Sequence, residues 1–240
     1  MSEPRAKLKS IAPQKVKHTE INSHYLLEGE KRLDAEHYTQ EGFRSKKLLT
    51  DSGYHLWSLG KLRIFNPPPL KRHFIEESSA SVPYLQPSEL FDFKVVPQKF
   101  VAPKKIKNVE DWYVKEGWII ISQSGNAGRP LFITKDFENI VISQNAIRIV
   151  PSEDTKAGFL YAYLSTRIGK SLVEQEQFGV TVKHLRPHHI ANIPVPEIDP
   201  AISERIHQQI VKAAQLRVEA NKIENEAILE LETLLSKAKR

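Results

Sequence analysis

The amino-acid sequence predicts an α+β fold, in which a mixed, mainly antiparallel sheet with flanking helices is followed by one long C-terminal helix. Short apolar runs bounded by polar loops, such as WIII at residues 118–121, are typical of buried strands. Apolar residues at three- and four-residue spacing in residues 157–168 indicate an amphipathic helix. After Pro200, residues 201–236 contain neither glycine nor proline, and their pattern indicates one continuous helix.

The length and composition limit the class of protein. A chain of 240 residues, of which 40% are hydrophobic, can form one large domain, alone or with an extended element. It contains no cysteine, which excludes disulfides, thiolate metal ligands and cysteine nucleophiles. No run approaches the ~18 apolar residues that a membrane-spanning helix needs. The N-terminus lacks the apolar segment of a secretory signal, so we expect a cytoplasmic protein.

Positive charge is concentrated in one segment. The formal net charge is +6, and residues 61–107 supply nine basic and four acidic residues, a net +5. A localised basic patch favours a polyanionic partner more than a uniformly basic surface does. A basic loop that is only solvated is the alternative that the charge count leaves open.

The N-terminal part of the chain divides into an arm and the start of a domain. Residues 1–30 are basic at first and are interrupted by two prolines, so we expect a basic arm there. A helix is expected at residues 39–50, ended by Gly53. Glu36 and Tyr38, just before this helix, are interpreted as structural.

Residues 66–69 (NPPP) are similar to the Asn/Asp-Pro-Pro-aromatic motif of amino-methyltransferases, whose aromatic ring stacks on a flipped-out base. The fourth position is Pro69, which cannot stack in that way. The sequence also lacks a strand followed by a glycine-rich loop for a methyl donor. We therefore interpret the segment as a rigid polyproline-like turn that carries Lys71, Arg72 and His73.

Several further strands are expected. Residues 82–90 read as a short strand ending in a turn that caps a helical turn, and residues 131–133 as another strand. Residues 140–150 alternate between apolar and polar, but Gln144 and Asn145 interrupt the alternation. The interruption indicates a bulge or a polar opening in the sheet. We expect these two side chains to form hydrogen bonds within the sheet rather than to contact the bases of a nucleic acid.

The candidate site is centred on residues 118–130 (WIIISQSGNAGRP). The first four residues predict a strand buried on both faces, and the rest form a polar loop with two glycines. A rigid strand that feeds such a loop can hold polar side chains still at a surface. For the stretch taken alone, an ordinary hairpin connection is an equal alternative.

Two patterns that suggest metal or nuclease chemistry are set aside. His184, His188 and His189 have no carboxylate at matched spacing, so a metal site is not predicted. Asp154-Thr155-Lys156 mimics half of a nuclease Asp-x-Lys signature without a convincing upstream acidic partner. The glycine loop at residues 178–183 has neither common phosphate-binding pattern, and no cofactor is predicted.

The C-terminal helix carries a heptad pattern that needs a partner. Pro200 suits the first helical turn, with Asp199 as N-cap. About 37 residues at ~1.5 Å each would give a rod of ~55 Å. Because its own domain offers too short a face, we expect the heptad seam to bind another helix. The seam consists of Ile206, Ala213, Leu216, Ala220, Ile223, Ala227 and Leu234.

Three segments occur in a defined order along the chain. They are WIIISQSGNAGRP, then VISQNAIRIVP followed by an amphipathic helix, then FGVTVKHLRPHHIANIPVPEI leading into the heptad helix. This order resembles the target recognition domain and following helix of type I restriction–modification specificity subunits. RLDAEHY and VPYLQPSEL, further upstream, are similar to other parts of that pattern. The resemblance covers residues 31–235, and the ordered set is more specific than any single motif.

The resemblance implies a subunit that reads double-stranded DNA without catalysis. It implies a target recognition domain at residues 31–197, and a coiled-coil helix at residues 198–240 that docks methyltransferase (M) and restriction (R) subunits. A usual member has two recognition domains and two antiparallel helices, whereas this chain has one of each. We expect a half-subunit that pairs with itself or with another specificity chain, or a truncated or split gene product. Two copies would imply a symmetric, interrupted DNA site.

Candidate DNA-binding residues follow from side-chain chemistry. Gln and Asn suit adenine, Arg and Lys suit guanine, and hydroxyl groups or main-chain amides suit phosphates. Thr181 and Lys183 are added because of the resemblance. The set is Lys71, Arg72, Gln86, Ser88, Lys104, Lys105, Gln123, Ser124, Asn126, Arg129, Thr181 and Lys183. The alternative functions are a DNA-acting enzyme, either a methyltransferase or a nuclease, and an assembly adaptor that does not read DNA.

Overall fold

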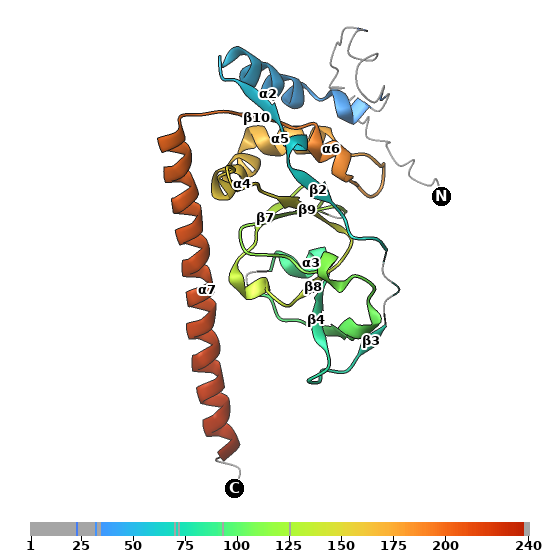
Figure 1. Cartoon of the computed structure of the whole chain (residues 1–240), viewed down its shortest axis with the longest axis vertical. Helices are drawn as coiled ribbons and strands as arrows, with labels where there is room; N and C mark the ends of the chain where they lie inside the picture. Colours follow the sequence, from blue (N-terminus) through green and yellow to red (C-terminus); the bar gives the residue numbers. More distant parts are fainter. Residues whose placement is uncertain are drawn as a thin grey trace, which may run out of the picture.

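The computed structural model confirms an α+β fold with a long C-terminal helix (Figure 1). It describes residues 23, 32, 35–69, 71, 73–92, 94–124 and 126–237. Nearly all of the expected arm at residues 1–30 lies outside the described residues, as does Arg72. No described helix is long and apolar enough to cross a membrane.

Helices and strands alternate along the described chain. The helices are α2 (Gln40–Asp51), α3 (Pro87–Leu90), α4 (Ala157–Ser165), α5 (Arg167–Gln175), α6 (Pro187–Ala191) and α7 (Pro200–Lys237). The 3-10 turns are η1 (Ala35–Tyr38), η2 (Leu59–Lys61), η3 (Pro103–Lys105), η4 (Val109–Asp111) and η5 (Lys135–Phe137). The strands are β1 (Leu56–Ser58), β2 (Arg63–Phe65), β3 (Phe74–Ile75), β4 (Val82–Leu85), β5 (Lys99–Val101), β6 (Ile119–Ser122), β7 (Pro130–Phe132), β8 (Val141–Ile142), β9 (Ala146–Val150) and β10 (Pro194–Pro196).

The described strands form three sheets rather than the single sheet that we expected. Two sheets have four strands each, in the orders β2-β9-β6-β7 and β3-β5-β4-β8, and β1 pairs with β10. All pairs are antiparallel except β4 with β8. The fold is therefore mixed and mainly antiparallel, as predicted.

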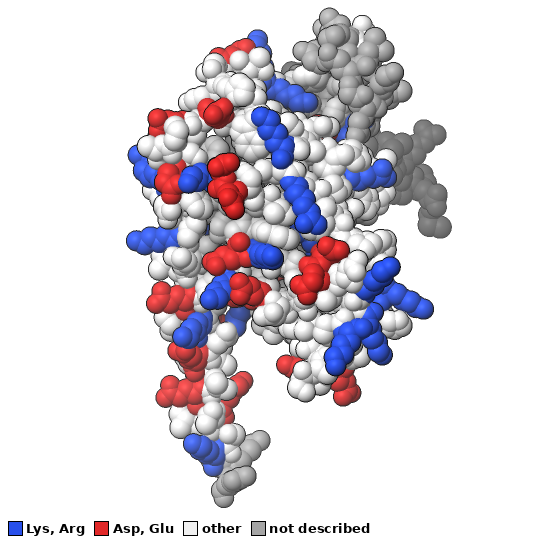
Figure 2. Space-filling model, in the orientation of Figure 1, with Lys and Arg blue, Asp and Glu red and all other residues white. Residues whose placement is uncertain are grey.

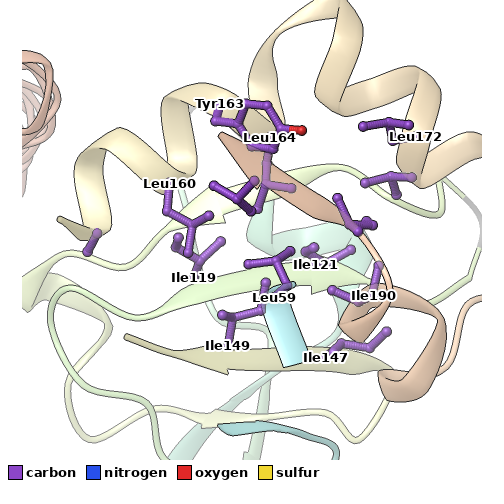
Figure 3. Packing of buried hydrophobic residues seen from close by; sticks show 14 of the residues in the cluster. Leu59, Ile119, Ile121, Ile147, Ile149, Leu160, Tyr163, Leu164, Leu172 and Ile190 are labelled. Carbon is purple, nitrogen blue, oxygen red and sulfur yellow. The ribbon is translucent and has the colours of Figure 1, made fainter. Parts of the chain in front are cut away.

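Strand β6 is the centre of the molecule because both of its faces are buried, as its continuous apolar run predicts. On one face, Ile119 and Ile121 pack with residues of α4, α5 and β9, including Leu160 and Leu172 (Figure 3). On the other face, Ile120 packs against Leu85 of β4 and Leu90 of α3. We call the sheet β3-β5-β4-β8 and the segments beside it the second sheet region. A loop that leaves the end of β6 therefore starts from a fixed position.

At Gln144 and Asn145, where we expected a bulge or a polar opening in the sheet, the chain forms a turn between two strands that belong to different sheets. Strand β8 pairs with β4, and β9 pairs with β6 and β2. The amide of Ser143 donates to the carbonyl of Leu85 at 2.9 Å, and the amide of Ala146 donates to the carbonyl of Ser143 at 3.2 Å. These bonds turn the chain from one sheet into the other.

The amphipathic segment at residues 157–168 is interrupted, because α4 ends at Ser165 and α5 begins at Arg167. Thr166 has extended backbone angles, and its side-chain oxygen accepts from the amide of Gly169 at 3.0 Å. It is therefore the N-cap of a second helix. Helix α2 matches its prediction closely, with Thr39 as N-cap. Tyr38 is buried and its hydroxyl donates to the carbonyl of Arg32 at 2.6 Å, whereas the side chain of Glu36 lies outside the described part.

Helix α7 begins as predicted, and Oδ1 of Asp199 accepts from the amides of Ala201 and Ile202 at 2.9 and 3.1 Å. Its own domain supports only the first half of the helix by packing, and large apolar side chains of the later turns, such as Leu229 and Leu234, stay exposed. The first half packs on α4, and Ala214 is buried there (Figure 1). An ion pair of 3.1 Å between Lys94 and Glu224 holds a later turn to the domain.

Candidate nucleic-acid interface

The polar loop after β6 is a hairpin connection to β7, and its own hydrogen bonds hold it in shape. Both the carbonyl and the side chain of Ser122 take part: the carbonyl accepts from the amide of Gly128 at 2.8 Å, and Oγ accepts from the amide of Arg129 at 3.2 Å and donates to the carbonyl of Asn126. Gly128 has φ +90°, and a Cβ there would lie 2.6 Å from Cγ1 of Val173. The loop is therefore both of the alternatives that the sequence left open: it is a hairpin connection, and it holds polar side chains at the surface.

The side chains of this loop differ in their exposure to solvent. Asn126 and Arg129 are exposed, whereas Gln123 and Ser124 are partly buried. The guanidinium of Arg129 lies 4.7 Å from the ring centroid of Phe91, within the range of a cation–π contact. This contact positions Arg129 at the surface and joins the loop to the segment after α3.

The glycine loop between α5 and α6 is a second hairpin, residues 178–184. Phe178 and His184 exchange main-chain hydrogen bonds of 3.0 and 2.8 Å. Gly179 has φ +101°, a conformation that a side chain would strain. Thr181 is exposed at the tip, and Nζ of Lys183 donates to the carbonyl of Gly179 at 2.9 Å. Sequence reasoning selected Thr181 and Lys183 only by resemblance.

The two hairpins lie side by side, although Ser124 and His184 are 60 residues apart in the chain. Ser124 forms a β-bridge with His184, and the amide of Leu185 donates to the carbonyl of Gln123 at 2.9 Å. Nε2 of Gln177 donates to the carbonyl of Ala127 at 2.8 Å. The structure thus joins the two loops that carry six of the candidate residues into one surface. In Figure 1, α7 runs along the left of the domain, and α6 lies at its upper right.

Asn66 is part of this surface, although it was not among the candidates. Its Nδ2 lies 3.2 Å from Oε1 of Gln123, 2.5 Å from the carbonyl of Gln144 and 3.1 Å from the carbonyl of Ala146. The NPPP segment therefore begins with a residue whose side chain bridges the loop after β6 and the turn between β8 and β9. The only signal in the sequence is an Asn before the prolines, directly after a short strand.

A buried arginine supports the turn beside Asn66. Arg148 is fully buried, and its guanidinium donates to the carbonyls of Trp112, Ile142, Ser143 and Ala146 at 2.6 to 3.3 Å. Burial lowers the pKa of Arg148 to about 9, so the group stays protonated at neutral pH. Carbonyl oxygens accept from both terminal nitrogens of the guanidinium, whereas its buried Nε has no hydrogen-bond partner in the described part of the chain. The four bonds hold the turn of residues 143–146 in place.

The remaining candidates lie in the second sheet region. Gln86 follows β4, and its main-chain N–H donates to Oε2 of Glu89 at 2.6 Å. Ser88 is exposed. Lys71, Lys104 and Lys105 are exposed. Basic side chains gather at the lower right of Figure 2, over the region where Figure 1 draws β3. The structure does not join these lysines to the two hairpins through any described contact.

The histidines near residue 184 and the Asp-Thr-Lys segment at residues 154–156 make contacts that support the fold. The ring of Phe178 lies 5.8 Å from that of His184 and 5.2 Å from that of His189, measured between centroids. Lys156 forms an ion pair of 2.6 Å with Glu204 on α7. Within the described part of the chain, no group of three His, Asp or Glu side chains could hold a metal ion.

A buried sheet core that carries two adjoining hairpins with polar side chains, together with a long C-terminal helix, is the architecture of a recognition module. The chain belongs to the family described as Type I restriction modification DNA specificity domain, which matches residues 67–233. This match covers well over half of the 240 residues. No curated protein matches the chain.

Two solved structures with TM-scores of at least 0.50 show the same fold at low sequence identity, and a third has a lower score. One comes from work on complex assembly and conformational transition of the type I R-M system, with a TM-score of 0.50, 15% identity, and coverage of 80% of this chain and 50% of that chain. The type IIG restriction endonuclease BpuSI gives a TM-score of 0.53, 15% identity, and coverage of 73% and 28%. The HsdS subunit from Thermoanaerobacter tengcongensis gives 0.48, 15%, and 83% and 50%. The chain therefore spans half or less of the length of these relatives.

Proposed function

We propose that this chain is the DNA-reading specificity subunit of a type I restriction–modification system and that it performs no catalysis itself. The observation that carries the proposal is the junction of the hairpins at residues 123–129 and 178–184, in a chain of this family. Both hairpins carry side chains that can donate or accept hydrogen bonds, as direct readout of base edges requires, although Val180 and Val182 of the second hairpin are also exposed. Separate methyltransferase subunits would then modify adenine at the site that the chain selects.

The candidate residues divide into two roles. Gln123, Asn126 and Arg129 suit base edges, while Ser124, Thr181 and Lys183 suit the sugar–phosphate backbone beside them. Gln86 and Ser88 are second-tier readers. Lys71, Lys104 and Lys105, which are exposed, and Arg72, which lies outside the described residues, would contact phosphates and supply sequence-independent affinity.

Helix α7 is the proposed site of assembly. The heptad seam includes Leu216, Ile223 and Leu234, which are 54%, 59% and 58% exposed although they are large and apolar. The ion pair between Lys94 and Glu224 and the packing on α4 hold a different side of the helix against the domain. We propose that a second copy, or another specificity chain, covers the seam, and that methyltransferase and restriction subunits dock on the resulting pair. The proposed domain boundary lies between residues 197 and 198.

A map of methylated adenines tests the proposal. Cells that contain the methyltransferase subunits should methylate one sequence motif only when this chain is present. Replacing Gln123, Asn126 and Arg129 together by Ala should abolish or alter the motif. A control triple variant of Arg44, Lys47 and Asn192, which are exposed on α2 and after α6, should leave the motif unchanged.

Other outcomes of the same experiment would overturn the proposal. A motif that survives the Gln123, Asn126 and Arg129 replacement while assembly still requires α7 would indicate an adaptor that does not read DNA. Methyl transfer or cleavage by the purified chain alone would indicate an enzyme.

A further inference from the structure

The side-chain amide of Asn66 can adopt only one orientation. Its nitrogen Nδ2 lies 2.5 Å from the carbonyl oxygen of Gln144 and 3.1 Å from that of Ala146. Main-chain carbonyls only accept hydrogen bonds, so the atom that faces them must be the nitrogen. Arg148 donates to the carbonyl of Ala146 as well, which fixes the position of this acceptor.

The orientation of Asn66 determines that of Gln123. The same Nδ2 lies 3.2 Å from the side-chain amide of Gln123, and an atom that faces a donor must be the oxygen Oε1. The main chain of Gln123 is also held, because its amide donates to Asn145 and its carbonyl accepts from Leu185, each at 2.9 Å. Rotation of the Gln123 amide by 180° would place two donors opposite each other.

This arrangement leaves one group free to bind. Nε2 of Gln123 has no hydrogen-bond partner among the described residues, and the residue is partly exposed beside Ser124. Oε1 retains a second lone pair. Gln123 therefore offers a donor in a fixed place with an acceptor next to it.

We propose that Asn66 is a positioning residue for base readout and that it makes Gln123 a donor to N7 of a purine. This inference rests on the proposed DNA-reading function. Purine N7 is an acceptor on the major-groove edge, and the remaining lone pair of Oε1 suits the N6 amino group of adenine. Adenine is therefore the preferred base, and guanine can be bound through its acceptors alone.

The test uses the assembled complex of this chain with its methyltransferase subunits, and duplexes that carry the motif found by methylation mapping. Each purine of the motif is replaced in turn by its 7-deaza analogue, which lacks the N7 acceptor. The wild-type complex should bind about tenfold more weakly when one particular purine is replaced. Asn66→Ala should bind the unmodified motif more weakly and should no longer respond to that replacement.

Gln123→Glu keeps the acceptor for Asn66 and the main-chain bonds but removes the outward donor. It should fold as the wild type does, and it too should no longer respond to the 7-deaza purine. Asn192→Ala, an exposed amide away from the hairpins, is the control and should respond as the wild type does. If Asn66→Ala or Gln123→Glu keeps the full wild-type response, the positioning role is wrong. If the wild-type complex has no sequence preference, the proposed function itself fails.

Discussion

The main-chain amide of Gly158 donates a hydrogen bond to Nδ1 of His207 at 3.0 Å, across the contact between α4 and α7. A Cβ at position 158 would lie 2.7 Å from the carbonyl oxygen of His207, closer than real Cβ contacts. An ion pair between Lys156 and Glu204 lies one turn earlier on α7. The long helix is therefore held to the recognition domain by a close approach that only glycine permits.

We expect Gly158→Ala to destabilise the protein, although Ala normally stabilises a helix interior relative to Gly by ~1 kcal/mol. The added methyl group meets main-chain atoms that cannot move alone, and overpacking of this kind costs ~1–3 kcal/mol. Urea unfolding should show the loss, and amide hydrogen exchange should be faster in the first turns of α7. Glu174→Ala, an exposed change on α5, should lie within ~0.5 kcal/mol of the wild type. A more stable Gly158→Ala variant would contradict the close contact.

Arg148→Met should be among the most destabilising single changes in the molecule. It removes a charged donor from four carbonyl oxygens, and losing a hydrogen bond to a charged group typically costs ~1.5–3 kcal/mol. The carbonyls of Trp112, Ser143 and Ala146 each keep a second donor, so we expect the total loss to be less than four times that value. The measurement is urea unfolding, with the exposed Arg44→Met on α2 as the matched control. Equal stability of the two variants would mean that the carbonyls find other donors.

The individual elements could be predicted from the sequence because each depends on local patterns. The apolar run of β6, the capped start of α7 at Asp199 and the glycine loop at residues 178–183 all follow from residue type and spacing. The break at Thr166 could not be predicted in this way. The three- and four-residue spacing of apolar residues continues across Thr166. The second helix starts there only because the Thr166 side chain caps it by accepting from the amide of Gly169.

The assembly of the candidate site depends on contacts between distant residues. The two hairpins meet through Leu185 and Gln123, a contact that requires β6 and α6 to pack on one core. Asn66 is 57 residues from Gln123, and nothing in the NPPP pattern indicates that its side chain bridges two turns. Such information lies in strand pairing, and no local pattern contains it.

Tyr163→Phe should change the dependence of stability on alkaline pH. The Tyr163 hydroxyl is buried and donates to the carbonyl of Pro194 at 2.5 Å, and burial raises the pKa of Tyr163 well above its ordinary value. The folded state therefore keeps its proton at a pH where the unfolded chain loses it. The stabilisation is complete below pH ~10 and is lost as pH rises further.

At pH 7 we expect the wild type to be ~1 kcal/mol more stable than Tyr163→Phe, because one hydrogen bond is lost. The difference should shrink when urea unfolding is repeated above pH ~10, where only the wild type must hold a buried hydroxyl against ionisation. A difference that grows with pH would show that the phenol is not protected by the fold.

Replacing Leu216 and Ile223 together by Glu should abolish self-association through α7. Both side chains are more than half exposed and belong to the seam, and burying each in a partner would contribute ~1.5–3 kcal/mol. Association should weaken at least ~100-fold, as measured by sedimentation of the full chain. Asn225→Glu, an exposed change on the other side of the helix, should have no such effect. If the wild-type chain stays monomeric, self-association is excluded, and the partner that covers the seam would be a different specificity chain.

Replacing Lys104 and Lys105 together by Ala should weaken binding of every duplex without changing which sequence is preferred. Both lysines are exposed on the surface at η3, and a phosphate contact contributes charge but no sequence information. Each lost contact should lower the slope of log affinity against log salt by ~0.9, so the double variant should lose up to ~2. Gln123→Ala should do the reverse, because it changes base preference and leaves the salt slope as it is. The double variant of Arg44 and Lys47 on α2 carries the same charge change away from this surface, and its slope should match the wild type. Equal slopes for the Lys104 and Lys105 variant and the wild type would place the DNA backbone elsewhere on the domain.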